Sequence, residues 1–399
     1  MNPRRTSGWS LAFLLASLGG QGLALSAFLT TSGLFAFSYL QGDTVGAQFA
    51  AWSAISSLGI LLALFPGTYW ALQSVLGRPE PAPGRFRRAW LAAAILLPLG
   101  LVVGTLAFRQ GGLGLTLTLG SLAHLLTTLS VCVLLVTLAL RQGPPVSGRR
   151  AAAAFTMGLT AIPLVAIVFE IAVLLPVSFL AGLWLIASRE GKELLQLFMS
   201  SGADPTALDP ALLAEWLQRP AVIAGVFAFT AGIVPCIEEI VKTAGVWRFL
   251  RRGLPAGQAF LMGALAGAGY GLFEALFLSQ PGPEWTSTAV GRIGASLMHA
   301  ATAGLTSWGL MEWARDRRWG RALGAYAAAV LAHATWNAAA LTTGFDELIR
   351  SAGASETTGL TTVSVGANLV LIGLSLGAFF LIARRKTEPA EPLEVPAPA

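Results

Sequence analysis

The chain has 399 residues, of which 55% are hydrophobic and only 12% are charged, and its mean hydropathy is +0.68. Charged residues make up about a quarter of a typical soluble protein, so this composition excludes a soluble globular domain and predicts an integral membrane protein. The formal net charge of +6 does not indicate nucleic-acid binding, because the basic residues lie in short loops between apolar runs. Cys132 and Cys236 lie within apolar segments and suggest neither a disulfide framework nor a metal-binding spacing.

Apolar runs of about 20 residues recur along the chain, which predicts an all-α, polytopic transmembrane helical bundle of about ten spans. The apolar run after Arg4 and Arg5 continues too far for a cleaved signal peptide and is interpreted as the first span. The predicted spans are 9–33, 48–76, 89–108, 113–140, 152–186, 220–247, 257–279, 287–313, 321–343 and 361–383.

The fifth span exceeds the usual length and contains Pro163 and Pro176. It is predicted to be either a kinked helix or a span followed by a surface element. Its one acidic residue, Glu170, is interpreted as interfacial or locally paired, outside the functional site.

Orientation follows from the distribution of lysine and arginine among the loops. One set of alternate loops and both termini hold 19 of these residues, whereas the other set holds five. The alternation persists across all ten predicted spans. Both termini are therefore predicted to be cytoplasmic.

The chain is predicted to comprise four regions. Residues 1–187 form accessory transmembrane helices, and residues 188–219 form an acidic, partly amphipathic non-cytoplasmic loop on the membrane surface. Residues 220–384 form the core that holds the intramembrane polar groups, and residues 385–399 form a disordered cytoplasmic tail rich in proline, glutamate and alanine.

The functional site is predicted around the segment 232–247, GIVPCIEEIVKTAGVW, which holds Glu238, Glu239 and Lys242 within an apolar span. An ionisable group at membrane depth costs at least about 2.5 kcal/mol and usually lines a site or a water-filled cavity. Glu238 and Lys242 are one helical turn apart and can form a structural charge pair or support catalysis. Pro235 is expected to kink the helix and open space beside it.

Three later spans contribute further polar residues at helical spacing. Tyr270 and Glu274 are four residues apart, Arg292 and His299 lie on the next span, and His333 and Asn337 share a face of the ninth. Glycines at positions 263, 267 and 271 predict a smooth stripe that allows a neighbouring helix to approach closely.

A rise of 1.5 Å per residue places these groups at compatible depths, which predicts one buried site built from four helices. Tyr270 is interpreted as a packing residue. The third histidine, His124, has no charged neighbours in its span and is interpreted as structural.

At these residues the chain resembles the PrsW-type membrane proteases, which are related to the CAAX prenyl proteases and bacteriocin-processing enzymes. The resemblance covers about residues 220–345 and rests on EEIVK, GYGLFEA, Arg292 followed by HAATAGL, and HATWN. CAAX-type enzymes have a histidine where this chain has Phe277, and an arginine five residues after the first glutamate where this chain has Lys242 at the fourth position. Both departures favour the PrsW branch.

The resemblance implies a glutamic intramembrane endopeptidase that needs no cofactor. The expected substrate is a single-span membrane protein, such as an anti-sigma factor, in a bacterial plasma membrane. Amide hydrolysis needs an activated water, donors for the oxyanion and a proton for the leaving amine. Glu238, assisted by His299 or Glu274, is predicted to activate the water, although Glu239 is an equal candidate. His333 and Asn337 are predicted to donate to the oxyanion.

Three alternatives remain open. Glu238, Glu274, His299 and His333 could bind zinc in a metalloprotease, although HExxH is absent and Lys242 would compete with a cation. The same groups could form the proton relay of a transporter, although no inverted repeat is evident. The chain could also be a scaffold that keeps a protease-like site for binding membrane-anchored partners.

Overall fold

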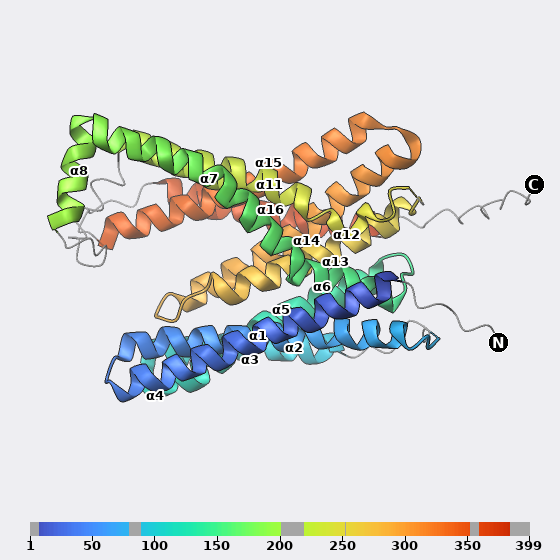
Figure 1. Cartoon of the computed structure of the whole chain (residues 1–399), viewed down its shortest axis with the longest axis horizontal. Coiled ribbons are helices and arrows are strands. Elements are labelled where there is room, and N and C mark those ends of the chain that lie inside the picture. Colours follow the sequence, from blue (N-terminus) through green and yellow to red (C-terminus); the bar gives the residue numbers. More distant parts are fainter. Residues whose placement is uncertain (1–7, 80–88, 201–218, 252, 352–358, 384–399) are drawn as a thin grey trace, which may run out of the picture. The chain divides into compact units, whose positions relative to one another are not determined.

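The computed structural model describes residues 8–79, 89–200, 219–251, 253–351 and 359–383, and every regular element in these ranges is a helix (Figure 1). Within these described residues, seven helical segments are long and apolar enough to cross a membrane: Ser10–Leu40, Thr44–Val75, Ala89–Gln110, Leu113–Gln142, Gly148–Trp184, Pro220–Trp247 and Ala256–Phe277. They correspond to the first seven predicted spans. The protein is therefore an all-helical, multi-pass membrane protein. The predicted tail, 385–399, lies outside the described residues.

The remaining three predicted spans are also helical. They are α14 (Trp285–Asp316), α15 (Trp319–Ser351) and α16 (Gly359–Ala383). Helices α14 and α15 carry the polar residues of the predicted site, and α15 continues past its predicted end at residue 343. Ten spans and cytoplasmic termini stay predictions.

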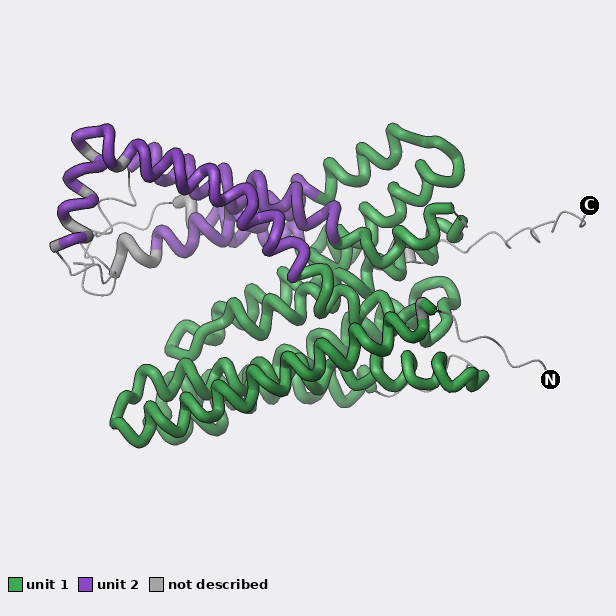
Figure 2. The backbone as a smooth tube through the Cα atoms, viewed as in Figure 1, with its two compact units in different colours: residues 1–163, 242–329, 372–399 green, residues 164–241, 330–371 purple. Residues whose placement is uncertain are grey.

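The described chain divides into two compact units, which are coloured separately in Figure 2. Unit 1 comprises residues 1–163, 242–329 and 372–399, and unit 2 comprises residues 164–241 and 330–371. Each unit contains segments of both the predicted accessory region and the predicted core region. The four-region division remains a prediction from the sequence.

Unit 1 contains α1 (Gly8–Leu40), α2 (Thr44–Val75), α3 (Ala89–Gln110), α5 (Ser121–Gln142), α6 (Gly148–Leu159), α13 (Ala256–Phe277) and α14. It also contains the short elements α4 (Leu113–Leu115), η1 (Thr116–Gly120) and α12 (Ala244–Trp247), together with the first part of α15 and the last part of α16. Helix α13 is buried along most of its length, and its side chains dominate the hydrophobic core of this unit.

Glycines on two faces of α13 allow neighbouring helices to pack closely against it. On one face, a Cβ atom at Gly267 would lie 2.2 Å from the carbonyl oxygen of His299 in α14. Cβ atoms at Gly263 and Gly271 would lie 2.3 Å and 2.7 Å from the nearest atoms of α14, which confirms the predicted glycine stripe. On another face, a Cβ atom at Gly269 would lie 2.4 Å from the carbonyl oxygen of Phe155 in α6.

Unit 2 contains most of α7 (Ala161–Ala187), together with α8 (Arg189–Ser200), α10 (Pro220–Phe227), η3 (Ala228–Ile233) and α11 (Val234–Val241). The later part of α15 and the first part of α16 complete it. The fifth predicted span is broken at Thr160, between α6 and α7, as the kinked-helix interpretation anticipated. Pro163 cannot donate to the carbonyl of Leu159, which accounts for a break at this point. The amphipathic α8 begins the predicted surface loop.

Candidate active site

The predicted site residues form two buried clusters, one in each unit. Helices α13 and α14 of unit 1 carry Glu274, Arg292 and His299. Lys242 lies in the turn between α11 and α12 and is the first residue of the second segment of unit 1. The close approach of α13 and α14 at Gly267 and Gly271 brings Glu274 and His299 within direct reach of each other.

In the unit 1 cluster, a chain of polar contacts runs from Lys242 to Arg292. Lys242 Nζ lies 2.7 Å from His299 Nδ1, and His299 Nε2 lies 2.8 Å from Glu274 Oε2. The same carboxylate oxygen accepts a hydrogen bond from Arg292 Nη1 at 3.2 Å. Lys242 Nζ also lies 4.5 Å from the ring centroid of Tyr270, a cation–π distance. Tyr270 thus packs as predicted and also contacts the cation.

A protonated Lys242 would fix the tautomer of His299 through these contacts. An ammonium group can only donate, so Nδ1 of His299 accepts from Lys242. Nε2 then carries the ring proton and donates it to the Glu274 carboxylate. With Lys242 and Arg292 positive and Glu274 negative, the cluster has a formal charge of +1. Lys242 and His299 are essentially inaccessible, with 0% and 1% of their surfaces exposed.

The unit 2 cluster begins with an irregularity just before the carboxylates. In η3 the carbonyl of each residue accepts from the N–H five residues later, as Phe229 does from Val234. The corresponding donor for Thr230 would be residue 235, which is proline and has no N–H. The Thr230 carbonyl instead accepts a hydrogen bond from Asn337 Nδ2 at 2.9 Å. The side chain of Asn337 therefore ties α15 to η3, one helical segment before Glu238 and Glu239.

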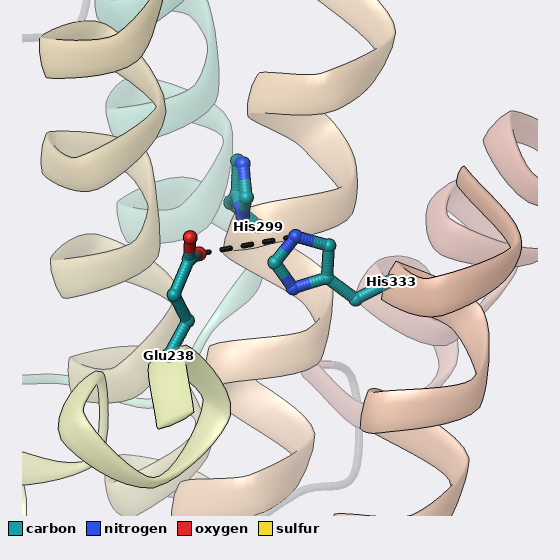
Figure 3. Close-up of side chains that lie close together, drawn as sticks. All are labelled: Glu238, His299 and His333. Carbon is teal, nitrogen blue, oxygen red and sulfur yellow. Dashed lines mark ion pairs between the residues drawn. The ribbon is translucent and has the colours of Figure 1, made fainter. Parts of the chain in front are cut away.

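Both carboxylates of α11 face the same imidazole on α15. His333 Nδ1 lies 2.9 Å from Glu239 Oε1, and His333 Nε2 lies 3.8 Å from Glu238 Oε2. Figure 3 shows Glu238 directed at the His333 ring, with the ion pair drawn. All three side chains are buried, and Glu239 is wholly inaccessible. The short contact fixes the ring and directs Nε2 toward Glu238.

The 3.8 Å distance between His333 Nε2 and Glu238 Oε2 limits what can lie between the two side chains. It is too long for a direct hydrogen bond, because such bonds span about 2.7–3.2 Å. It is short enough for one water molecule or one metal ion to contact Glu238 and His333 together. A carboxylate and an imidazole nitrogen that share a water are the usual components of general base catalysis.

The eight predicted site residues all lie in the two clusters, but some of their contacts were not predicted. Helix α11 ends at Val241, so Lys242 lies outside the helix that the predicted Glu238–Lys242 pairing assumed. The structure gives Lys242 an unpredicted partner, His299. The Thr230 carbonyl was also missed, although Pro235, five residues later, was the available signal.

Two comparisons found no match: neither a curated protein nor a solved structure is significantly similar to this chain. The helical fold and the two buried clusters define a multi-pass membrane protein with carboxylates and histidines in contact inside its helical segments.

More than half of the chain, residues 148–365, matches the family model described as PrsW family intramembrane metalloprotease. The chain therefore belongs to this family of intramembrane proteases. The match begins well before the predicted limit of the resemblance at residue 220 and includes α6 and α7. Residues 1–147, which contain α1 to α5, lie outside it.

Proposed function

We propose that the protein hydrolyses a peptide bond of a single-span membrane protein by glutamate-based general base catalysis. The observation that carries this proposal is the pair of carboxylates around His333, with Glu239 2.9 Å from one ring nitrogen and Glu238 3.8 Å from the other. Family membership supplies the reaction class. An anti-sigma factor in a bacterial plasma membrane remains the substrate suggested by the resemblance.

The roles follow from the contacts in unit 2. Glu239 accepts the Nδ1 proton of His333, which leaves Nε2 as an acceptor. A water between Glu238 and His333 would donate one hydrogen to each. Its oxygen would attack the peptide carbonyl carbon while Glu238 takes the proton. Glu238 would then return that proton to the leaving nitrogen as the C–N bond breaks. In this tautomer His333 orients the water instead of donating to the oxyanion.

The oxyanion requires donors, and two groups suit this role. Asn337 uses one of its N–H bonds at Thr230 and has a second to offer. The positive charges of Lys242 and Arg292 in the unit 1 cluster would suit a developing negative charge. We propose that Lys242, Glu274, Arg292 and His299 of the unit 1 cluster also take part in the reaction, as the family resemblance at these residues implies.

Zinc-dependent hydrolysis is the second candidate, and a specific observation favours it. A ligating histidine usually gives its other ring nitrogen to a carboxylate, which is how Glu239 holds His333. Glu238 and His333 would hold the ion with His299, three residues of suitable ligand type. When bound, the ion would lower the pKa of a coordinated water. His299 would first have to release Lys242 or Glu274, because both of its ring nitrogens are engaged.

The test is cleavage of tagged single-span reporter proteins by the purified protein in liposomes. Glu238→Gln keeps the size of the side chain and removes the base, and we expect cleavage to fall by roughly 10²–10⁴-fold. The matched control is Glu284→Gln, the same change at an exposed position. Normal cleavage by Glu238→Gln would overturn the mechanism. Activity that a strong chelator abolishes and zinc restores would establish the metal-dependent alternative.

A further inference from the structure

Helices α13 and α14 form a helical hairpin. Side chains from α2, α3 and α5, all within unit 1, contact the tip of this hairpin. The last carbonyls of a helix have no partner within that helix, and in apolar surroundings they need one. The Leu276 carbonyl accepts hydrogen bonds from Ser56 Oγ at 2.6 Å and His124 Nε2 at 3.4 Å. The Ser279 carbonyl accepts from Trp52 Nε1 at 2.7 Å.

The same side chains fix the start of α14. Trp285 Nε1 lies 3.4 Å from His124 Nδ1, and an indole N–H can only donate. The other nitrogen of His124 therefore carries the ring proton and donates it to Leu276, so that one imidazole bridges the end of α13 and the beginning of α14. Trp52 stacks on the His124 ring at a centroid distance of 4.0 Å. His124 is structural, as predicted, and this bridge is its role.

Helix α3 completes the enclosure around Trp285. Thr105 Oγ1 and Thr286 Oγ1 are hydrogen-bonded at 2.9 Å. A Cβ atom at Gly104 would lie 2.2 Å from Trp285 Cζ3, so only glycine admits the indole at this depth. Trp285 is 1% exposed in consequence.

This arrangement lies close to the unit 1 cluster along both helices. Glu274 precedes Leu276 by two residues, and Arg292 follows Trp285 by about two helical turns. The Glu274–Arg292 ion pair therefore joins the two helices just inside the hairpin tip. Displacement at the tip would change the geometry of that pair and of the Glu274 contact with His299.

We infer that α2, α3 and α5, which lie outside the region shared with the family, form a clamp that positions Glu274 and Arg292 for catalysis. The clamp consists of Trp52, Ser56, Thr105 and His124. Its residues are positioning residues that act through the hairpin, and the inference about catalysis rests on the proposed function. It assigns a role to helices whose purpose the sequence left open.

The experiment compares two variants of the full chain in liposomes, Ser56→Ala and the double variant Trp52→Phe/Ser56→Ala. The phenylalanine keeps a ring at position 52 but removes the N–H that reaches Ser279. Ser17→Ala is the matched control, because Ser17 and Ser56 are both 0% exposed and Ser17 is hydrogen-bonded to Thr68, away from the hairpin. Ser56→Thr restores a hydroxyl and serves as the rescue.

Amide hydrogen exchange of residues 276–292 measures the clamp without relying on activity. We expect about fivefold faster exchange for each hydrogen bond removed, unchanged exchange in Ser17→Ala, and recovery in Ser56→Thr. In the cleavage assay we expect kcat to fall by roughly tenfold in the double variant while KM stays constant, because geometry and not substrate binding is altered.

The two readouts separate the two ideas. Unchanged exchange in the double variant would show that no clamp exists. Faster exchange with an unchanged kcat would show that the clamp does not position the site. If the wild-type protein cleaves no reporter, the proposed function fails, and a clamp confirmed by exchange would then be structural only, which overturns the positioning role.

Discussion

Replacing Lys242 with methionine tests the central electrostatic feature of unit 1. Methionine has nearly the length of lysine but lacks the ammonium group that donates to His299 Nδ1 at 2.7 Å. A hydrogen bond to a charged group is worth about 1.5–3 kcal/mol, which corresponds to about a 10- to 150-fold lower kcat if the contact is fully used in the transition state. The ring of His299 would also lose the partner that assigns its tautomer.

The assay is cleavage of the single-span reporter in liposomes, with zinc content measured on the same preparation. Lys242→Arg retains a cation and should recover part of the activity, although its planar group fits this contact differently. Lys192→Met is the matched control, because it makes the same change at an exposed position in α8.

One result would refute the reasoning directly. If Lys242→Met bound zinc more tightly and cleaved the reporter faster than the wild type, Lys242 would be a competitor of the metal and not a functional cation. Its contact with His299 would then describe the metal-free protein, and the zinc-dependent alternative would replace the glutamate mechanism.

Two further substitutions test how the helices position the clusters. Gly267→Ala would place a Cβ atom 2.2 Å from the His299 carbonyl and should destabilise the protein by about 1–3 kcal/mol in thermal unfolding, whereas Gly245→Ala, where the nearest atom is 3.7 Å away, should be close to neutral. A neutral result at both positions would contradict the described packing of α13 on α14. Asn337→Ala removes the donor to the Thr230 carbonyl, so we expect the free energy of unfolding to fall by about 1–3 kcal/mol and kcat to fall as well. Stability equal to that of the wild type would show that this hydrogen bond does not stabilise the fold.

Much of the fold could be predicted because it depends on composition and spacing. An apolar chain must satisfy its backbone within helices, so the all-helical class and the positions of the first seven spans followed directly from the sequence. The contact between Gly263, Gly267 and Gly271 and α14 was predictable for a similar reason, since small residues four apart line one helical face.

The candidate site was predictable in its members but not in its connections. Ionisable residues in apolar spans are conspicuous, so Glu238, Glu239, His299 and His333 could be identified individually. Which nitrogen faces which carboxylate depends on helix rotation, and no spacing rule supplies that between distant segments. His124 shows the limit most clearly: an apolar span with one histidine gave no sign that its ring joins two other helices.

The π-helical turn at 228–233 has a consequence for the direction of the two carboxylates of α11. Each residue of an α-helix advances by about 100° around the axis, so one residue accommodated in a wider turn changes the angular phase of everything after it. The angular positions of the apolar side chains of α10 therefore do not dictate where Glu238 and Glu239 point. Residues before this turn can therefore be substituted without changing the direction of the two carboxylates. A single-residue deletion within 228–233 would rotate both carboxylates away from His333.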